Sequence, residues 1–264
     1  MSSTIRSSAG RAAALTTAAI VGLSTAAVAG AGSIDELVEM NQRAWGGELE
    51  LLEEVYTPEG MHTATYRDGT SEYTGPQEIE QVAGYGSVEL VGPRIDILNG
   101  DDEWRWASFA TIGGGTACLY HALDGQIVRH DCVLPVQRGV AAATAGLADA
   151  ESTAAIDEVE ARLDGSWGRH ATAESLGEVY APDAVHSARY LNTTKTYDGL
   201  EEILGVAGIS SGNIDQLGER VDFEAPDGEL AWAQVVDIAG GTVCLFRAVE
   251  GMITRHDCVL PING

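Results

Sequence analysis

The spacing of apolar residues predicts that each half of the chain opens with a helix. In the second half, apolar residues recur at helical spacing from Ile156 to Trp167. In the first half, Ser33-x-x-Glu36 has the pattern of a capping box, which satisfies free backbone N–H groups where a helix begins. A second short helix is expected near 49–56 and 175–180, and a proline stops it in each half.

Alternating apolar and polar positions predict that most of the remainder is strand. A third helix is expected after Gly75 or Gly199. Asp124-Gly125 and Glu250-Gly251 are expected to turn the last hairpin of each half. Helices followed by a meander of antiparallel strands predict an α+β domain whose helices gather on one face of a curved antiparallel sheet. The strands expected are Met61–Arg67, Val88–Leu98, Trp104–Ile112, Ala117–Leu123, Ile127–Leu134, Val185–Tyr190 and the later equivalents in the second half.

The two halves share an ordered series of identical residues, which indicates a tandem duplication. Arg129–Pro135 and Arg255–Pro261 are the same seven residues, and further identities recur upstream in the same order. An Ala- and Gly-rich stretch separates the halves. We therefore expect a first domain over residues 33–137, a linker over 138–151 and a second domain over 152–264.

The amino-terminal segment has the composition of an export signal. The first 34 residues contain no Asp or Glu, and Arg6 and Arg11 precede a long uncharged run. Ala27-Val28-Ala29 fits a small-x-small cleavage site. We expect a signal peptide over residues 1–29 and a periplasmic or secreted protein, with a disordered Ala/Ser-rich tail as the alternative. The run is too weakly hydrophobic for a stable membrane span, so no membrane insertion is expected after signal removal.

The charge balance narrows the choice of partners. Lys and Arg total 15 against 40 for Asp and Glu, which gives a net charge of −25. Such a surface repels phosphate backbones and anionic headgroups, so nucleic acid is not expected as a partner. The acids are spread along the chain, which favours a solubilising surface.

Four cysteines form two pairs about the last hairpin of each half. If each hairpin had a three-residue loop, the paired cysteines would lie directly opposite each other, near disulfide range. Two such disulfides agree with export; four reduced core thiols are the alternative. Zinc is not expected, because no C-x-x-C is present. The predicted pairs are Cys118 with Cys132 and Cys244 with Cys258.

Several motifs recur in both halves. A helix ends near Trp45 or Trp167, Val-Tyr-x-Pro-Glu/Asp follows, Tyr-x-Gly precedes a helix, and the last hairpin ends in Arg-His. This pattern resembles the SnoaL-like branch of the nuclear-transport-factor-2-like superfamily, which includes polyketide cyclases, ketosteroid isomerases, limonene epoxide hydrolase and scytalone dehydratase. The resemblance covers both halves and implies two cone-shaped domains, each with a pocket between helices and sheet. Members pair through their sheets, so it also implies an internal pseudo-dimer or a homodimer.

The resemblance argues against a steroid-isomerase mechanism. The catalytic Asp of those isomerases matches Ala64 and Ala188, and their oxyanion-holding Tyr aligns near Met40. Superfamily members include enzymes, binding modules and scaffolds, so the fold does not assign an activity.

Histidines remain as the candidate acid–base groups. On the first strand, alternation places His62, Ala64 and Tyr66 on one face, and on the last strand it places Val128, His130 and Cys132 on one face. Each half is therefore expected to direct two histidines at one cavity, where they could act as general acid and base. The alternative is structural: a hydrogen bond to a backbone carbonyl, strand pairing, or contact between the halves. The candidate catalytic residues are His62, His130, His186 and His256, and the candidate cavity walls are Tyr66, Tyr190, Trp106 and Trp232.

The sequence thus suggests an exported enzyme of isomerase, cyclase, lyase or epoxide-hydrolase type acting on a small apolar molecule. No phosphate-binding loop, serine nucleophile elbow or metal-ligand cluster is evident, so no cofactor and no metal are expected. A non-catalytic small-ligand binding or scaffold module is the alternative, since the isomerase Asp and Tyr are missing.

Overall fold

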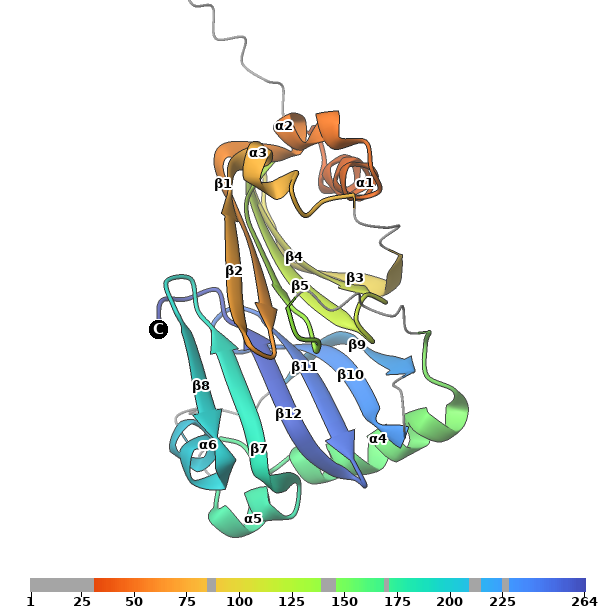
Figure 1. The fold of residues 1–264 in the computed structure, drawn as a ribbon, viewed down its shortest axis with the longest axis vertical. Coiled ribbons are helices and arrows are strands. Elements are labelled where there is room, and N and C mark those ends of the chain that lie inside the picture. Colours follow the sequence, from red (N-terminus) through yellow and green to blue (C-terminus); the bar gives the residue numbers. More distant parts are fainter. Residues whose placement is uncertain (1–30, 85–88, 139–145, 169–170, 209–214, 225–227) are drawn as a thin grey trace, which may run out of the picture.

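Two six-stranded sheets, one from each half of the chain, pack against each other in this computed structural model (Figure 1). The structure describes residues 31–84, 89–138, 146–168, 171–208, 215–224 and 228–264. The predicted signal peptide, residues 1–29, and most of the predicted linker lie outside the described residues.

The same elements follow one another in both halves, with the helices at the two far ends of the molecule (Figure 1). The first half contains α1 Ile34–Trp45, the 3-10 turn η1 Leu49–Leu51, α2 Leu52–Val55, β1 Tyr56–Tyr66, β2 Gly69–Thr74, α3 Gly75–Ile79, β3 Leu90–Asn99, β4 Glu103–Ala110, β5 Thr116–Leu123 and β6 Gln126–Val133. The second half contains α4 Ala150–Leu163, α5 Ala173–Gly177, β7 Tyr180–Arg189, β8 Thr194–Asp198, α6 Gly199–Ala207, β9 Gln216–Glu224, β10 Leu230–Val236, β11 Thr242–Val249 and β12 Met252–Val259.

The α+β class and the two tandem domains are confirmed, but each sheet is mixed rather than antiparallel. The strand orders are β2-β1-β6-β5-β4-β3 and β8-β7-β12-β11-β10-β9. β1 pairs antiparallel with β2 on one side and parallel with β6 on the other, and β7 does the same with β8 and β12. In the first half, β1 is hydrogen-bonded to its hairpin partner β2 along one edge. Only its other edge is free to pair with β6, the last strand of the meander.

The last hairpin differs from the predicted three-residue loop. Leu123 pairs with Gln126, so only Asp124 and Gly125 form the turn, both with positive φ. This conformation favours a tight two-residue hairpin turn. A register shift follows, because Ala122 pairs with Ile127 whereas His121 pairs with Arg129. The second half repeats the same turn and the same shift.

This extra residue in the last strand is a β-bulge, which changes the face on which the later side chains lie. Ile127, rather than the predicted Val128, belongs to the same core cluster as Cys132. The bulge also brings Cys118 opposite Cys132 and Cys244 opposite Cys258. The local irregularity of β6 and β12 therefore determines which side chains face the helices.

Each sheet buries both of its faces. One face packs on the helices of its own half, around Trp106 in the first half and Trp232 in the second. The other faces of the two sheets meet in a shared apolar cluster between the halves, which includes Phe109, Leu119, Phe223 and Leu245.

The contact between the halves is pseudo-symmetric. A Cβ on Gly115 would lie 2.6 Å from the Phe223 ring, and a Cβ on Gly241 would lie 2.5 Å from Ile97. Gly115 and Gly241 are matching positions of the repeat, with φ of 110° and 106°. An interface in which one patch meets its own repeat is the isologous arrangement of a two-fold dimer, here within one chain.

Two buried arginines of the second half add an asymmetric element to the same contact. Arg247 of the second half donates to the Gly114 carbonyl of the first half at 2.6 Å and pairs with Glu229. Arg189 of the second half donates to Glu72 of the first half at 2.7 Å. Among the described residues, no helix is long and apolar enough to cross a membrane.

Candidate active site

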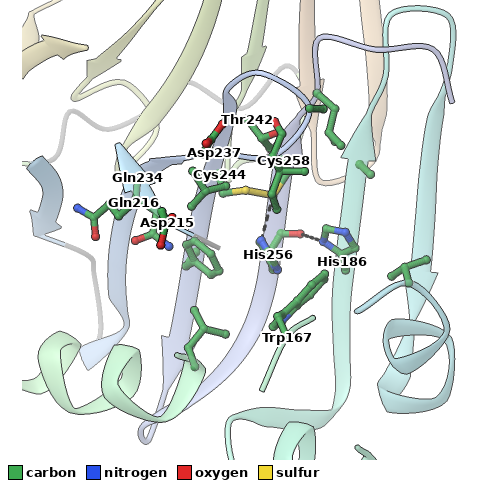
Figure 2. Close-up of a pocket in the computed structure, with 18 of the residues that line it drawn as sticks. Trp167, His186, Asp215, Gln216, Gln234, Asp237, Thr242, Cys244, His256 and Cys258 are labelled. Atoms are coloured by element: carbon green, nitrogen blue, oxygen red, sulfur yellow. Dashed lines mark hydrogen bonds between the residues drawn. A yellow bond between two sulfur atoms is a disulfide. The ribbon is translucent and has the colours of Figure 1, made fainter. Parts of the chain in front are cut away.

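A cavity of about 1060 Å³ lies between the sheet and the helices of the second copy. Its walls come from α4, α6 and the strands β7 to β12. His186 and His256 both line it, together with the Cys244–Cys258 disulfide (Figure 2). The strand face predicted to carry the candidate histidines is thus the face that bounds this cavity.

His186 is fixed in one tautomer by its neighbouring strand. Its Nδ1 lies 2.8 Å from the backbone oxygen of His256 (Figure 2). A carbonyl oxygen can only accept, so Nδ1 carries the proton and Nε2 keeps its lone pair. The ring of Tyr197 stacks on the His186 ring, and Trp167 meets it edge-on. His186 therefore enters the cavity wall as a rigid, neutral hydrogen-bond acceptor.

His256 is held between a tyrosine and the disulfide. Trp167 Nε1 donates to the Tyr180 hydroxyl at 2.8 Å, and that hydroxyl lies 3.0 Å from His256 Nδ1. His256 Nε2 lies 2.9 Å from Cys258 Sγ. A disulfide sulfur has no hydrogen, so Nε2–H donates to the sulfur and the Tyr180 hydroxyl donates to Nδ1. Both ring nitrogens of His256 are thus engaged.

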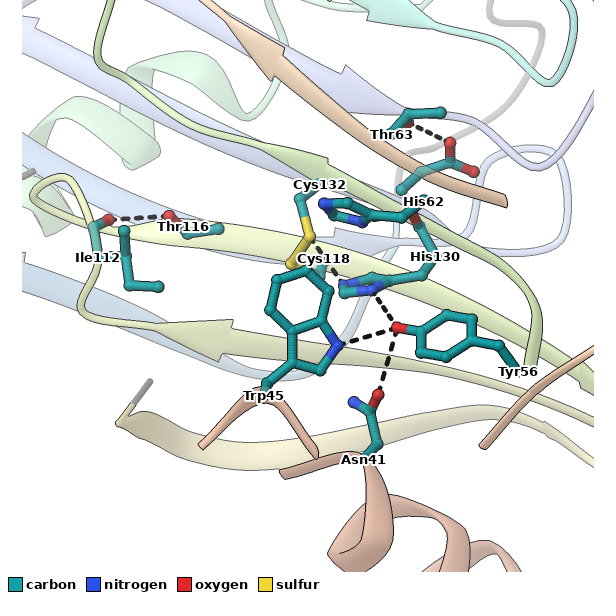
Figure 3. Close-up of a disulfide and its surroundings, with 11 residues drawn as sticks. Asn41, Trp45, Tyr56, His62, Thr63, Ile112, Thr116, Cys118, His130 and Cys132 are labelled. Carbon is teal, nitrogen blue, oxygen red and sulfur yellow. Dashed lines mark hydrogen bonds between the residues drawn. A yellow bond between two sulfur atoms is a disulfide. The ribbon is translucent and has the colours of Figure 1, made fainter. Parts of the chain in front are cut away.

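The first copy repeats this arrangement in nearly every contact (Figure 3). His62 Nδ1 donates to the His130 carbonyl at 3.1 Å, and the Tyr56 hydroxyl lies 2.8 Å from His130 Nδ1. His130 Nε2 lies 3.0 Å from Cys132 Sγ. The Tyr56 hydroxyl also lies 3.3 Å from Asn41 Oδ1. In the second copy, Leu163 stands at the same distance before its tryptophan as Asn41 does before Trp45.

Burial keeps all four histidines neutral near pH 7. Removal from water lowers the pKa of His62 and of His186 to about 4, because the imidazolium form loses its hydration. Burial also lowers the pKa of His130 and His256 well below the usual value, and the neighbouring histidine lowers it further. Each copy therefore presents a pair of uncharged imidazoles whose rings lie 4.5 Å apart.

The two predicted disulfides are confirmed. Cys118 is bonded to Cys132 and Cys244 to Cys258, with Cα–Cα distances of 4.1 and 4.2 Å. The sequence did not predict their contact with the histidines. In both copies a disulfide sulfur accepts a hydrogen bond from Nε2 of a candidate histidine.

The predicted wall residues lie in different environments. Tyr190 and Ala188 line the cavity of the second copy beside His186. Trp232 is fully buried in the core, stacked on Phe246, and is not among the lining residues. In the first copy, Trp106 is likewise buried and stacks on Tyr120, and Tyr66 is half-buried with Arg138 over its ring.

Other cavity residues were missed from the sequence. Lys195 and Gln234 line the cavity, as do the exposed acids Asp164, Asp215 and Asp237. Lys195 Nζ lies 5.2 Å from the centre of the Tyr190 ring. Ala64 pairs with Ser71 where Ala188 pairs with Lys195, and Ser108 stands where the second copy has Gln234. Lys195 and Gln234 are therefore not shared by the two copies, so the repeat does not identify them.

Potential metal ligands gather in the same places. Within the described residues, ligand atoms of each group lie within 4.8 Å of one another. Each cysteine of these groups is engaged in a disulfide. The groups are His62, His130 and Cys132 in the first copy and His186, His256 and Cys258 in the second.

Comparison with known proteins finds similarity in solved structures. No protein-family model and no curated protein matches the chain. A SnoaL-like family protein from Agrobacterium tumefaciens strain C58 is 11% identical, with a TM-score of 0.32, and covers 40% of this chain and 97% of its own. A nuclear-transport-factor-2-like protein of unknown function from Burkholderia xenovorans LB400 is 10% identical, with a TM-score of 0.29, covering 41% and 87%.

A third similar structure contains a small ligand of its own. It is a protein with a ketosteroid isomerase-like fold from Catenulispora acidiphila in complex with trimethylamine; it is 17% identical, with a TM-score of 0.26, and covers 39% of this chain and 85% of its own. At these identities the likeness is one of fold alone.

Proposed function

We propose that this chain carries out cofactor-free acid–base chemistry on a small, mostly apolar molecule, with the second-copy cavity as its principal site. The observation that carries the proposal is His186, a neutral imidazole anchored through Nδ1 in the wall of a cavity of about 1060 Å³. The reaction belongs to the isomerase, cyclase, lyase or epoxide-hydrolase type, in which a proton moves between carbon, oxygen and a protein base.

His186 serves as the base in this proposal. Its Nε2 has the lone pair, and the Nδ1 hydrogen bond to the His256 carbonyl holds the ring and stabilises the imidazolium that forms. A low pKa makes His186 a weak base toward an isolated proton. A substrate that develops negative charge beside the ring offsets this, because an ion pair forms inside the cavity. Lys195, Tyr190 and Tyr197 line the same cavity and can donate hydrogen bonds to a developing oxyanion.

The charges around the cavity restrict the substrate class. Asp157 and Glu160 are paired with Arg220. Asp164, Asp215 and Asp237 also line the cavity and add negative charge. Lys195 is the one Lys or Arg among the described residues that line it. An anionic substrate would be repelled at this entrance, so we expect a neutral or cationic molecule with an apolar body.

A non-catalytic small-ligand binding or scaffold module remains the second candidate. It is favoured by Ala188, which lines the cavity at the position matching the isomerase Asp. A ligand that copurifies unchanged, detected by native mass spectrometry, would support it.

The acid–base proposal is tested by proton exchange, which does not require the natural substrate. A tetralone is incubated with the protein in D₂O, and deuterium uptake beside the carbonyl is followed by NMR. Hydrolysis of an apolar epoxide is measured in parallel. The comparison is between wild type and His62→Asn/His186→Asn, because the Asn amide can still donate to the carbonyl that Nδ1 contacts. Faster exchange or hydrolysis in wild type supports the proposal, whereas equal rates for both proteins contradict it.

We also propose that the chain is exported, with residues 1–29 as its signal peptide and with domains over 33–137 and 152–264. The amino-terminal composition and the two disulfides support this proposal. The mass of the protein purified from its native compartment tests it. Cleavage after Ala29 is the expected result, and an intact amino terminus inside the cell would refute it.

A further inference from the structure

We propose that each disulfide masks a metal site, so that reduction of the cysteines creates a Cys₂His₂ centre for Zn²⁺ from the neighbouring imidazoles. The inference starts from the His186, His256 and Cys258 group, whose ligand atoms lie within 4.8 Å of one another. Reduction of the disulfide frees Cys244 on the adjacent strand as a fourth donor. Two sulfurs and two imidazole nitrogens are the donor set of tetrahedral structural zinc.

The four donors lie on one face of three adjacent strands. Cys244 on β11 is directly opposite Cys258 on β12, and His186 on β7 is directly opposite His256 on β12. The first copy places Cys118, Cys132, His130 and His62 in the same register. The sheet therefore holds the donors together before any ion binds, which lowers the entropic cost of ordering them on binding.

The hydrogen bonds around the imidazoles are those that orient metal ligands. A metal-binding histidine commonly donates its other ring N–H to a backbone carbonyl or a similar acceptor. His186 already does so through Nδ1, which leaves Nε2 available. His256 has the Tyr180 hydroxyl at Nδ1 and the disulfide sulfur at Nε2. When Nε2 binds an ion, the proton moves to Nδ1 and is donated to the Tyr180 oxygen.

Access favours the site. His186, His256, Cys244 and Cys258 all line the large cavity, which gives an ion a route from solvent. The acidic residues at this cavity attract cations toward it.

The chemical step balances with a thiol reductant as co-reactant. Two equivalents of a thiol reduce the disulfide to two cysteine thiols and become one disulfide themselves. Zn²⁺ then displaces the two thiol protons, which pass to solvent. Disulfide and metal are mutually exclusive, so the site reports the redox state of its surroundings.

The residue that can accept the tyrosine hydroxyl hydrogen differs between the two copies, and this predicts different affinities. When His130 donates through Nδ1, the Tyr56 hydroxyl must direct its own hydrogen elsewhere, and Asn41 Oδ1 lies 3.3 Å away. Leu163 stands at the matching position of the second copy and offers no acceptor. We expect the first copy to bind the ion more tightly, and Asn41→Leu to remove the difference.

Cobalt is the probe for the test, because Co²⁺ bound by thiolates in a tetrahedral site absorbs visible light strongly. The full chain is reduced with a phosphine, separated from it without oxygen, and titrated with Co²⁺ and then Zn²⁺. The expected result is a thiolate–cobalt charge-transfer band in the reduced protein, its absence in the oxidised protein, and its loss when Zn²⁺ displaces Co²⁺. Tyr180→Phe, in a Cys118→Ser/Cys132→Ser background that isolates the second copy, should weaken binding by about 10–100-fold.

His186→Asn and His256→Asn in the same background separate a designed site from adventitious thiolate binding. Each should abolish the tetrahedral spectrum. A spectrum unchanged by both substitutions, or no thiolate–cobalt band in reduced wild type, would overturn the proposal. Cys244→Ala provides the His186, His256 and Cys258 group without any reductant, and circular dichroism verifies its fold. If this folded variant also fails to bind Co²⁺, the failure cannot be attributed to instability of the reduced chain, and the proposal is overturned. The assay involves no substrate, so its outcome is independent of the proposed acid–base activity.

Discussion

Replacing His62 and His186 together by asparagine should remove a defined part of the acid sensitivity of folding. Both side chains are about 5% exposed, and burial lowers the pKa of each from 6.5 to about 4. The asparagine amide can replace the Nδ1–H donor to the facing carbonyl but does not titrate in this range. The substitution therefore removes the titration with little change in the neighbouring hydrogen bonds.

The sign of the effect follows from proton binding in the two states. Between pH 6.5 and about 4 the unfolded chain protonates each histidine and the folded chain does not, so the free energy of unfolding falls as the pH falls. A pKa difference of about 2.5 units corresponds to about 3 kcal/mol for each histidine. The contribution is fully present above pH 6.5 and is lost by about pH 4.

Guanidinium unfolding followed by tryptophan fluorescence, at intervals from pH 7 to pH 4, measures this difference directly. Over that range, the free energy of unfolding of wild type should fall by about 6 kcal/mol more than that of the double variant. Because the chain carries a net charge of −25, acid also relieves repulsion in both proteins, and the comparison between them cancels this background. His121→Asn is the control for a more exposed histidine, because the His121 side chain is 28% exposed. Parallel pH profiles for wild type and the double variant would refute the reasoning.

Three further results are expected. Gly241→Ala should destabilise the fold in chemical denaturation, because its Cβ would lie 2.5 Å from an isoleucine of the first sheet; Gly47→Ala, with a similar positive φ and open space, should cost far less, and equal losses would contradict the close packing of the sheets. Cys118→Ser/Cys132→Ser should lower the free energy of unfolding by about 3 kcal/mol, measured against wild type under oxidising conditions, and a negligible change would contradict the loop-closure argument. The pH–rate profile of any turnover that depends on His186 should be flat near neutrality and fall as the pH approaches about 4; a fall near pH 6.5 would indicate a solvated imidazole instead.

The repeated residues made much of the fold predictable. Identities in the last hairpin located the disulfide partners, and alternation placed His62 and His186 on the strand face that bounds the cores. The hairpin strands β2 and β8 were missed, because their residues are largely exposed on both faces and give no apolar alternation. The parallel pairing of β1 with β6 joins segments distant in sequence, and no local pattern reports it.

The finer features of the site depend on contacts that a sequence does not display. Equal spacing of Cys118 and Cys132 about Gly125 suggested a three-residue loop, but a two-residue turn with a bulge gives the same spacing. The bulge decides that Ile127, and not Val128, shares the cluster of Cys132. The contact of His130 with the disulfide likewise arises from side-chain packing across strands.

The pseudo-symmetric contact between the sheets has a consequence for how such a chain can diversify. In a homodimer, every substitution appears on both sides of the axis. Joining the copies removes this constraint: Arg189 and Arg247 face the first half from the second, while the matching positions hold Thr65 and His121. Arg189 is paired with Glu72, and the position of the second half that matches Glu72 holds Thr196. Mutation can therefore reshape the site of one half while the other half keeps its inherited form, and the covalent link lets the two halves evolve separately.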